Sequence, residues 1–425
     1  MQIRSPKLRS RLSIVILGNA FMRIASGASG VLVGLYLADL ANRGLHVNAA
    51  LVGTLGAVSF GAELIASVPM GLASDAIAPR GLMTGGAFLG AIATQLFGMS
   101  TQPSIFFLSR TVEGLGAAAV TPSLLSHLTD VTHGRHSLRA RVMSFFELSL
   151  LAGLALGGLT GAQLWHFLSA RAFSAVAVIY VLSACLLIFG AVGSWGHGSA
   201  RAISGFYTAL KEPSLQRLAP VWLCVNTIVG LWLGPTLPFL LTHKGGANQF
   251  LDGIFSNQPE RVGWLLLGYS LIFGIGVTAW SFVLPRMTEQ RALRIALVAM
   301  VGVCLGLFLL NHSGAESPAV RWTIGTSTAL CIMVESGFTP AALSLLAGAI
   351  GAQAGRGAAM GIYSVLLSIG AIVGSLFAAA FGQAFAVDGL IYSTFAMAIV
   401  ALFFVRWIRL GLAESEEHLN AETTV

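Results

Sequence analysis

Arg110 and Glu113 lie three residues apart in the stretch SRTVEGLGAAA, residues 109–119, inside a long apolar run. Residues at this spacing share one face of a helix, so the guanidinium and the carboxylate can pair. An arginine in the hydrocarbon core of a membrane costs about 2.5–3.5 kcal/mol, and each charge of a pair lowers the cost of the other. One interpretation of the two residues is therefore a structural salt bridge.

The second interpretation of the pair is a proton site. Burial and a neighbouring guanidinium act in opposite directions on a carboxylate, and a carboxylate poised between them can load and release protons near neutral pH. Arg110 can alternatively hold an anionic group of a substrate, because its guanidinium binds carboxylate or phosphate with two hydrogen bonds. We predict that Glu113 and Arg110 are the main proton-coupling residues.

Four further ionisable side chains interrupt apolar runs, namely Arg23, Glu63, Glu147 and Glu335. Ionisable residues inside a membrane helix mark functional sites by default, because their burial is costly. Glu63 and Glu335 are predicted to take part in proton coupling, Glu335 as the one acidic residue expected to be buried in the second half. Glu147 lies closer to the end of its run and is expected to pair with an arginine at the membrane surface.

A polar stripe runs along the first apolar segment, where Asn19, Arg23, Ser26 and Gly30 follow one another at spacings of four, three and four. These spacings place them on one helix face. The stripe is a candidate lining of a substrate cavity, and the alternative for Arg23 is an interhelical ion pair with Glu63 or Glu147. Asn226 and Tyr363 are further cavity candidates, although packing explains them about as well.

The elements that carry these residues are membrane helices. The chain has 425 residues, of which 56% are hydrophobic and only 10% charged, whereas roughly a quarter of a soluble domain is charged. A helix needs about 20 apolar residues to cross a bilayer. The sequence predicts an all-α, polytopic membrane protein with twelve spans, near 12–39, 50–74, 81–100, 104–127, 142–165, 171–193, 218–242, 262–285, 292–310, 321–346, 358–382 and 387–408.

Charge and motifs exclude two other classes of protein. The net charge of +7 comes from basic residues scattered over short loops, and no basic face interleaved with aromatic residues indicates a nucleic-acid partner. The sequence contains no HExxH, GxSxG or GxxxxGK[ST] motif, so a membrane enzyme is not favoured. No motif calls for a metal or an organic cofactor.

Basic residues concentrate in alternate loops, and the positive-inside rule then places both termini in the cytoplasm. We expect an N-terminal six-helix bundle over residues 1–193, a cytoplasmic linker over 194–217, a C-terminal six-helix bundle over 218–410 and a cytoplasmic tail over 411–425.

An internal repeat relates the two halves. RARVMSFFELSLLAGLALGG, from Arg139, and RGAAMGIYSVLLSIGAIVGS, from Arg356, share an arginine, a methionine and two glycines at a constant offset. The segment VTPSLLSHL, from Val120, likewise matches FTPAALSLL, from Phe338, with the offset changed by one residue. Two matches in the same order indicate two related bundles in parallel orientation.

With these features the sequence resembles the major facilitator superfamily. The loop GLASDAIAPRG carries a form of that family's motif in Gly71, Asp75 and Arg80, with Ala76 where a basic residue is usual. The helix that carries the charged pair resembles the family pattern R-x-x-x-G-x-G, in which Arg110 is followed by Gly114 and Gly116. The Gly-Pro element of drug antiporters is absent from the stretch GLALGGLTG, residues 153–161.

The resemblance implies a monomeric secondary transporter that moves a small organic molecule by alternating access, with protons and the lipid bilayer as its other partners. It implies a cytoplasmic gate formed by Gly71, Asp75, Arg80, Arg139, Arg141 and Glu147. It also implies a location in a bacterial inner membrane and no cofactor beyond the proton gradient. Proton-coupled export is favoured, and the alternative is proton-coupled uptake, or symport, of a small anionic metabolite.

Overall fold

The computed structural model describes residues 6–76, 79–132, 136–191, 213–245, 248–349 and 356–422, and within these ranges the regular structure is helical. The first half contains α1 (Pro6–Asn42), α2 (Ala49–Ala76), α3 (Pro79–Gly98), α4 (Pro103–Val131), α5 (His136–Leu168), the short 3₁₀ helix η1 (Ser169–Arg171) and α6 (Ala172–Gly190). The second half contains α8 (Pro213–Leu233), α9 (Thr236–Thr242), α10 (Arg261–Val283), the short 3₁₀ helix η2 (Leu284–Arg286), α11 (Glu289–Asn311), α12 (Pro318–Glu335), α13 (Phe338–Ala349) and α14 (Arg356–Glu422).

Within the described ranges, nine helical segments are long and apolar enough to cross a membrane, so the predicted count of twelve is not confirmed. Two of the nine, Ala155–Gly190 and Val365–Arg406, are 36 and 42 residues long and each covers parts of two predicted spans. The helix α4, which carries the charged pair, is not among the nine. The structure is nevertheless all-α within the described ranges, and the membrane class is confirmed.

Two residues with left-handed backbone interrupt the long helical segments. Ser169 has φ 49° between α5 and α6, and Ala386 has φ 50° inside α14, where the backbone is not helical. Such a conformation is uncommon for residues other than glycine. Ser169 and Ala386 are separated by the same number of residues as Arg139 and Arg356. The sequence repeat therefore extends to the turn between the last two spans of each half.

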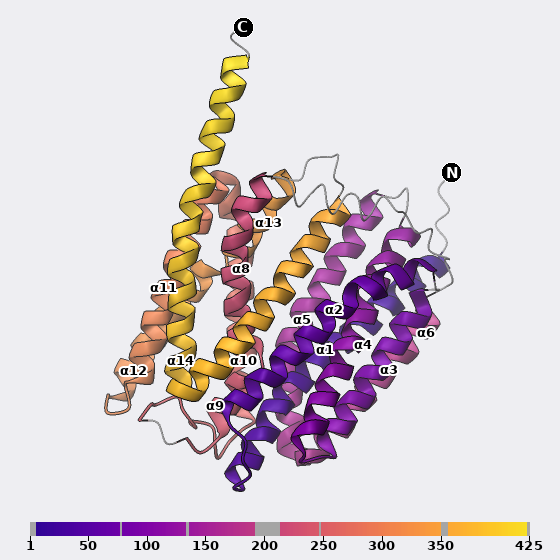
Figure 1. Ribbon diagram of the computed structural model, residues 1–425, viewed down its shortest axis with the longest axis vertical. Coiled ribbons are helices and arrows are strands. Elements are labelled where there is room, and N and C mark those ends of the chain that lie inside the picture. Colours follow the sequence, from indigo (N-terminus) through magenta and orange to yellow (C-terminus); the bar gives the residue numbers. More distant parts are fainter. Residues whose placement is uncertain are drawn as a thin grey trace. The chain divides into compact units, whose positions relative to one another are not determined.

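The chain divides into two compact units. Unit 1 comprises Met1–Ser199, Gly234–Gly246 and Gly253–Ser270, and its helices α1–α6 are drawn from indigo to magenta in Figure 1. In this unit α1 packs on α5 and α6, α3 packs on α4 and α6, and α2 packs on α4. A hydrophobic cluster in its core includes Leu12, Met83, Leu124 and Leu187.

Unit 2 comprises Ala200–Leu233, Ala247–Asp252 and Leu271–Val425. Here α8 packs against α14, and α11 packs against α12, α13 and α14. Its main core cluster is built around Trp222, Trp280, Leu293 and Phe338. Most of the predicted linker lies outside the described residues, since 192–212 are not described, so the expected domain limits stay a prediction.

The repeated glycines make the same helix contact in each unit. In unit 1, Gly153 of α5 packs on Arg23 of α1, and a Cβ at Gly157 would lie 2.9 Å from Gly27 Cα. In unit 2, Gly370 of α14 packs on Asn226 of α8, and a Cβ at Gly374 would lie 2.9 Å from Gly230 C. Small residues at a crossing let membrane helices approach closely. Arg23 and Asn226 therefore occupy equivalent positions in the two repeats.

The α3–α4 crossing provides a prediction with an adjacent control. A Cβ at Gly86 would lie 2.5 Å from the Gly116 carbonyl oxygen, whereas a Cβ at Gly85 would meet nothing within 4 Å. Gly86→Ala should therefore lower the free energy of unfolding by about 1–3 kcal/mol through overpacking. Gly85→Ala should be neutral or slightly stabilising, since alanine favours helix. Thermal unfolding of both purified variants in one detergent measures the difference, and equal melting temperatures would contradict the proposed close contact.

Candidate functional site

The predicted pair on α4 is a buried ion pair in the structure. Arg110 donates a hydrogen bond from Nη1 to Glu113 Oε2, and the two side chains are 7% and 9% exposed. Arg110 Nε has no hydrogen-bond partner. The neighbouring Ser109 hydroxyl donates to the Ala93 carbonyl of α3 at 2.7 Å, which fixes this end of α4 against α3. The spacing thus predicted the pairing, while the coupling role stays a prediction.

The motif glycines of α4 bring two neighbouring helices onto the pair. A Cβ at Gly114 would lie 3.1 Å from Glu63 N of α2 and 2.9 Å from Ala62 Cβ. A Cβ at Gly116 would lie 2.7 Å from the Gly86 carbonyl oxygen of α3. Side chains at both positions are excluded, so α2 and α3 approach α4 at backbone distance. The glycines of the motif therefore position Glu63 beside the charged pair.

Arg23 of α1 completes this arrangement from a third helix. Its Nη2 donates to the Thr121 hydroxyl of α4 at 3.1 Å. Glu63 interacts electrostatically with both Arg23 and Glu113. We call Arg23, Glu63, Arg110 and Glu113 the charged cluster of unit 1. It combines two cations and two carboxylates from α1, α2 and α4 inside one compact unit.

The polar stripe of α1 divides into two kinds of contact. Asn19 is 1% exposed, and its Nδ2 donates to the Ser149 hydroxyl of α5, whereas its Oδ1 is buried without a hydrogen-bond partner. Ser26 lies near the hydroxyl of the buried Tyr180 of α6. At Gly30 a Cβ would meet nothing within 4 Å. The stripe thus contacts a neighbouring helix through the Asn19 amide nitrogen and opens into free space at Gly30.

Of the two cavity candidates in the second half, the structure describes the side chain of one. Asn226 of α8 is 4% exposed, and its Nδ2 has no hydrogen-bond partner. A buried amide donor without a partner is a candidate for contact with a ligand or an ordered water. Tyr363 lies in α14, and its side chain is outside the described residues. Their cavity role stays a prediction.

Glu335 is the last residue of α12 and is 9% exposed. Ser336 and Gly337 interrupt the helix before α13, although the sequence indicated one span over 321–346. Trp280 of α10 donates from Nε1 to the Val334 carbonyl at 3.0 Å, and its indole packs on Gly337. Among the residues described in unit 2, no basic side chain forms an ion pair with Glu335. Interrupted membrane helices are typical of ion and substrate sites in transporters.

The predicted cytoplasmic gate is only partly described. Gly71 and Asp75 lie in α2, and Arg139, Arg141 and Glu147 lie in α5, but the side chains of all five are outside the described residues. Arg80 stands in the first turn of α3 and is exposed. The gating role of these residues stays a prediction.

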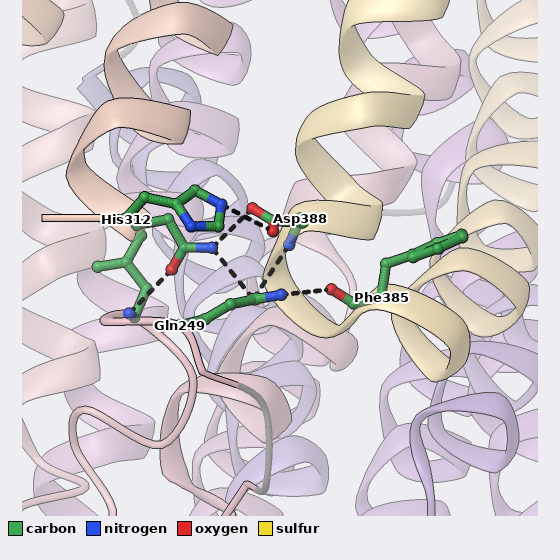
Figure 2. Close-up of polar contacts among 6 residues, drawn as sticks. Gln249, His312, Phe385 and Asp388 are labelled. Atoms are coloured by element: carbon green, nitrogen blue, oxygen red, sulfur yellow. Dashed lines mark hydrogen bonds and ion pairs between the residues drawn. The ribbon is translucent and has the colours of Figure 1, made fainter. Parts of the chain in front are cut away.

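Sequence reasoning overlooked a polar cluster in unit 2, shown in Figure 2. Asp388 accepts from Asn311 Nδ2 at 2.8 Å, and its second oxygen lies 3.0 Å from His312 Nε2. Gln249 accepts from Asn311 Nδ2 at 3.0 Å and donates to the Phe385 carbonyl at 2.8 Å, beside the turn at Ala386. The available signal was Asp388 itself, an acidic residue in a predicted span.

Removing the Asp388 carboxylate should destabilise unit 2. Asp388 is 5% exposed, so Asp388→Ala removes the acceptor of one Asn311 amide N–H and the carboxylate beside the His312 ring, while Gln249 still accepts from Asn311. We expect a loss of about 1–3 kcal/mol in the free energy of unfolding and a smaller loss for Asp388→Asn, which keeps one oxygen acceptor. Thermal unfolding with the exposed Glu316→Ala as control tests this, and a melting temperature for Asp388→Ala equal to that of the control would refute it.

The comparison with known families agrees with this architecture. The sequence model described as Major Facilitator Superfamily matches residues 15–322, which is well over half of the chain. The chain belongs to the major facilitator superfamily. The match includes α4 with its charged pair and the two motif glycines. Membership of this transporter family agrees with the prediction of a transporter rather than an enzyme.

Curated relatives are distant and match only part of this superfamily member. A gentisate transporter of Corynebacterium glutamicum is 25% identical over 36% of this chain and 33% of its own length. Multidrug resistance protein 2 of Bacillus subtilis is 23% identical over 34% of this chain and 36% of its own. The lysophospholipid transporter LplT of Yersinia enterocolitica is 28% identical over 49% and 50%. The chain thus spans between a third and a half of the length of these relatives.

Solved structures match almost the whole chain. A bacterial homologue of the human lysosomal transporter Spinster has a TM-score of 0.69 at 16% identity, covering 96% of this chain and 97% of its own. The nucleoside transporter NupG has a TM-score of 0.67 at 13% identity, covering 94% and 98%. At these identities the likeness establishes the fold, and it extends beyond residue 322 to the second half.

Proposed function

We propose that this protein is a proton-coupled secondary transporter that exports a small organic molecule by alternating access. The observation that carries the proposal is the charged cluster of unit 1, in which Glu113 is buried against Arg110 and Glu63 lies within electrostatic reach. A membrane helix carries buried charges at a large cost. A purely structural contact between helices needs no ionisable groups, as the Asn19–Ser149 contact in the same unit illustrates.

The cluster has the elements of a proton-dependent switch. Protonation of Glu113 removes the negative charge that pairs with Arg110. Glu63, which interacts with Arg23 and Glu113, is then the remaining ionised carboxylate of the cluster. One proton therefore redistributes two cations over the remaining anion, and a ligand or proton that stabilises one arrangement shifts its population. A cationic or neutral substrate that binds near the ionised carboxylates would compete with protons, which is antiport.

The alternative function is proton-coupled uptake of a small anionic metabolite. The observation that favours it is the presence of two arginines, Arg23 and Arg110, in the same cluster. When Glu113 is protonated, Arg110 becomes available to an anionic group of a substrate. Proton and anion then bind together, which is symport. Among the relatives are a gentisate transporter and a multidrug resistance protein, so similarity favours neither direction.

Ligand-dependent thermal stability separates the two functions. The purified protein is heated with a library of organic cations, neutral amphiphiles, carboxylates and phosphates at pH 5.5 and pH 8. A ligand that binds the folded state raises the melting temperature according to its affinity and concentration. Stabilisation by cations or neutral compounds that is stronger at pH 8 supports antiport, because protons compete. Stabilisation by small anions that is stronger at pH 5.5 supports symport.

Proton movement then tests direction. For a ligand found in the screen, an exporter that works by antiport should release protons from acidified everted vesicles when the ligand is added outside. A symporter should instead alkalinise the medium of lightly buffered intact cells. If neither preparation responds to any ligand that stabilises the protein, the proposal of proton coupling is wrong.

The cellular location and the oligomeric state of the protein are also part of the proposal. Arg286, Arg291 and Arg294 surround the start of α11, and Arg406 lies towards the end of the apolar part of α14. With the N-terminus inside, these arginines face the cytoplasm, as the positive-inside rule requires. We place the protein in a bacterial inner membrane as a monomer with both termini in the cytoplasm and no cofactor.

A further inference from the structure

A groove on the surface of unit 2 lies between α11 and α12. It has a volume of about 450 Å³. Its walls are apolar side chains that include Ile295 and Val298 of α11 and Leu330 and Val334 of α12, and Arg294 lies at its α11 side. Val298 and Leu330 are 60% and 59% exposed. An exposed apolar wall on a membrane helix faces hydrocarbon, so this groove is open to lipid.

The shape of the groove follows from the residues at the α11–α12 contact. A Cβ at Gly302 would lie 3.0 Å from the Cys331 sulfur, and Gly306 packs directly against Thr328. The absence of side chains at these two glycines lets α11 and α12 approach closely there. Nearer the start of α11, branched side chains replace these glycines, and the groove lies at this level, within about three turns of the first residue, Glu289.

Arg294 provides a charge that no carboxylate in the described part of the chain neutralises. Its Nε is buried and has no hydrogen-bond partner. Among the described residues, no carboxylate forms an ion pair with it. The nearest acidic residue along α11, Glu289, accepts a hydrogen bond from Ser344, and Glu335 at the end of α12 is buried. Arg291, one turn before Arg294, is exposed and adds a second positive charge to the same end of the helix.

We propose that this groove is a binding site for an anionic phospholipid of the cytoplasmic leaflet. One acyl chain would lie along the apolar wall between Val298 and Leu330, and the headgroup phosphate would accept hydrogen bonds from the Arg294 guanidinium. Basic residues at a cytoplasmic pocket between membrane helices recognise anionic headgroups, and arginine binds phosphate with its planar fork of donors. This site consists of residues other than those of the charged cluster of unit 1 and does not depend on the proposed transport activity, while its assignment to the cytoplasmic leaflet rests on the proposed orientation.

The proposal is tested by lipid binding to the purified, delipidated full-length protein. Phosphatidylglycerol and phosphatidylcholine with identical acyl chains are titrated separately, and bound lipid is counted by native mass spectrometry. We expect phosphatidylglycerol to bind more tightly, and Arg294→Gln to weaken that binding about fivefold or more, as one arginine near a membrane surface contributes about 1 kcal/mol. Val298→Trp should weaken it as well, because the indole would fill the groove.

Matched variants and a soluble probe keep the result specific. Arg406→Gln removes an exposed arginine at the end of the apolar part of α14, in the same unit, and should leave phosphatidylglycerol binding unchanged. Glycerol phosphate, which has the anionic group without acyl chains, should not compete at the same concentrations. The proposal is overturned if Arg294→Gln and Arg406→Gln bind phosphatidylglycerol equally, if the two lipids bind equally to the native protein, or if glycerol phosphate alone displaces the lipid.

Discussion

Glu113→Gln is expected to abolish proton-linked transport while the protein still folds. Glutamine has the shape of the glutamate side chain but cannot exchange a proton near neutral pH. Positioned proton donors and acceptors contribute about 100- to 10,000-fold to the rates they serve, so we expect the coupled flux to fall about 100-fold or more. The measurement is proton release from acidified everted vesicles with a ligand from the stability screen.

This substitution also leaves the buried Arg110 without its carboxylate, and breaking a buried pair costs about 3–5 kcal/mol. A loss of transport in Glu113→Gln alone is therefore also explained by the lower stability of the variant. The double variant Arg110→Gln, Glu113→Gln removes both charges and should recover most of the lost melting temperature. If the pair is only structural, the double variant recovers transport as well. If Glu113 is the proton site, the double variant is stable and remains uncoupled.

A second readout needs no membrane. A substrate that competes with a proton should displace it from the native protein in detergent, and a pH indicator in weak buffer records the release. Glu113→Gln should bind the same ligand without release. Unaltered proton release in this variant would show that the coupling site lies elsewhere, with Glu63 and Glu335 as the next carboxylates to substitute.

Glu335→Gln is expected to make the protein more stable and less active. The carboxylate is buried at the interruption between α12 and α13 and has no basic partner among the described residues. Burying a charge without a partner is costly, and the neutral isostere removes that cost. We expect the free energy of unfolding at pH 8 to rise by about 1 kcal/mol or more and coupled transport to fall at least about tenfold.

The opposite signs of these two effects distinguish a functional carboxylate from a structural one. A structural residue loses stability and activity together, whereas groups kept at a cost in stability are typical of working sites. The exposed Glu316→Gln serves as the control and should change neither quantity. A less stable Glu335→Gln protein with full transport would show that the carboxylate is structural.

The α4 pair and the repeat show how far local pattern reaches in this protein. Arg110 and Glu113 are one turn apart on a helix, so their pairing depends on helix geometry alone and is visible in the sequence. The matching glycines after Arg139 and Arg356 likewise predicted two related halves. In the structure, Gly153 meets Arg23 and Gly370 meets Asn226. The sequence related the two halves to each other, but it did not reveal that Arg23 in one half and Asn226 in the other occupy equivalent positions.

Composition and periodicity by themselves determined the membrane class, the all-α fold, the internal repeat and the short-range ion pair, because each depends on residues close together in the chain or on averages over it. Tertiary structure decided the rest. Glu63 lies beside the charged pair because Gly114 has no side chain and α2 can approach α4 closely there. The Asn311–Asp388 hydrogen bond joins residues far apart in sequence. Asn19 pairs with Ser149 of another helix. Such contacts depend on how helices cross, and a pattern along one helix carries no information about the side chain that a neighbouring helix presents to it.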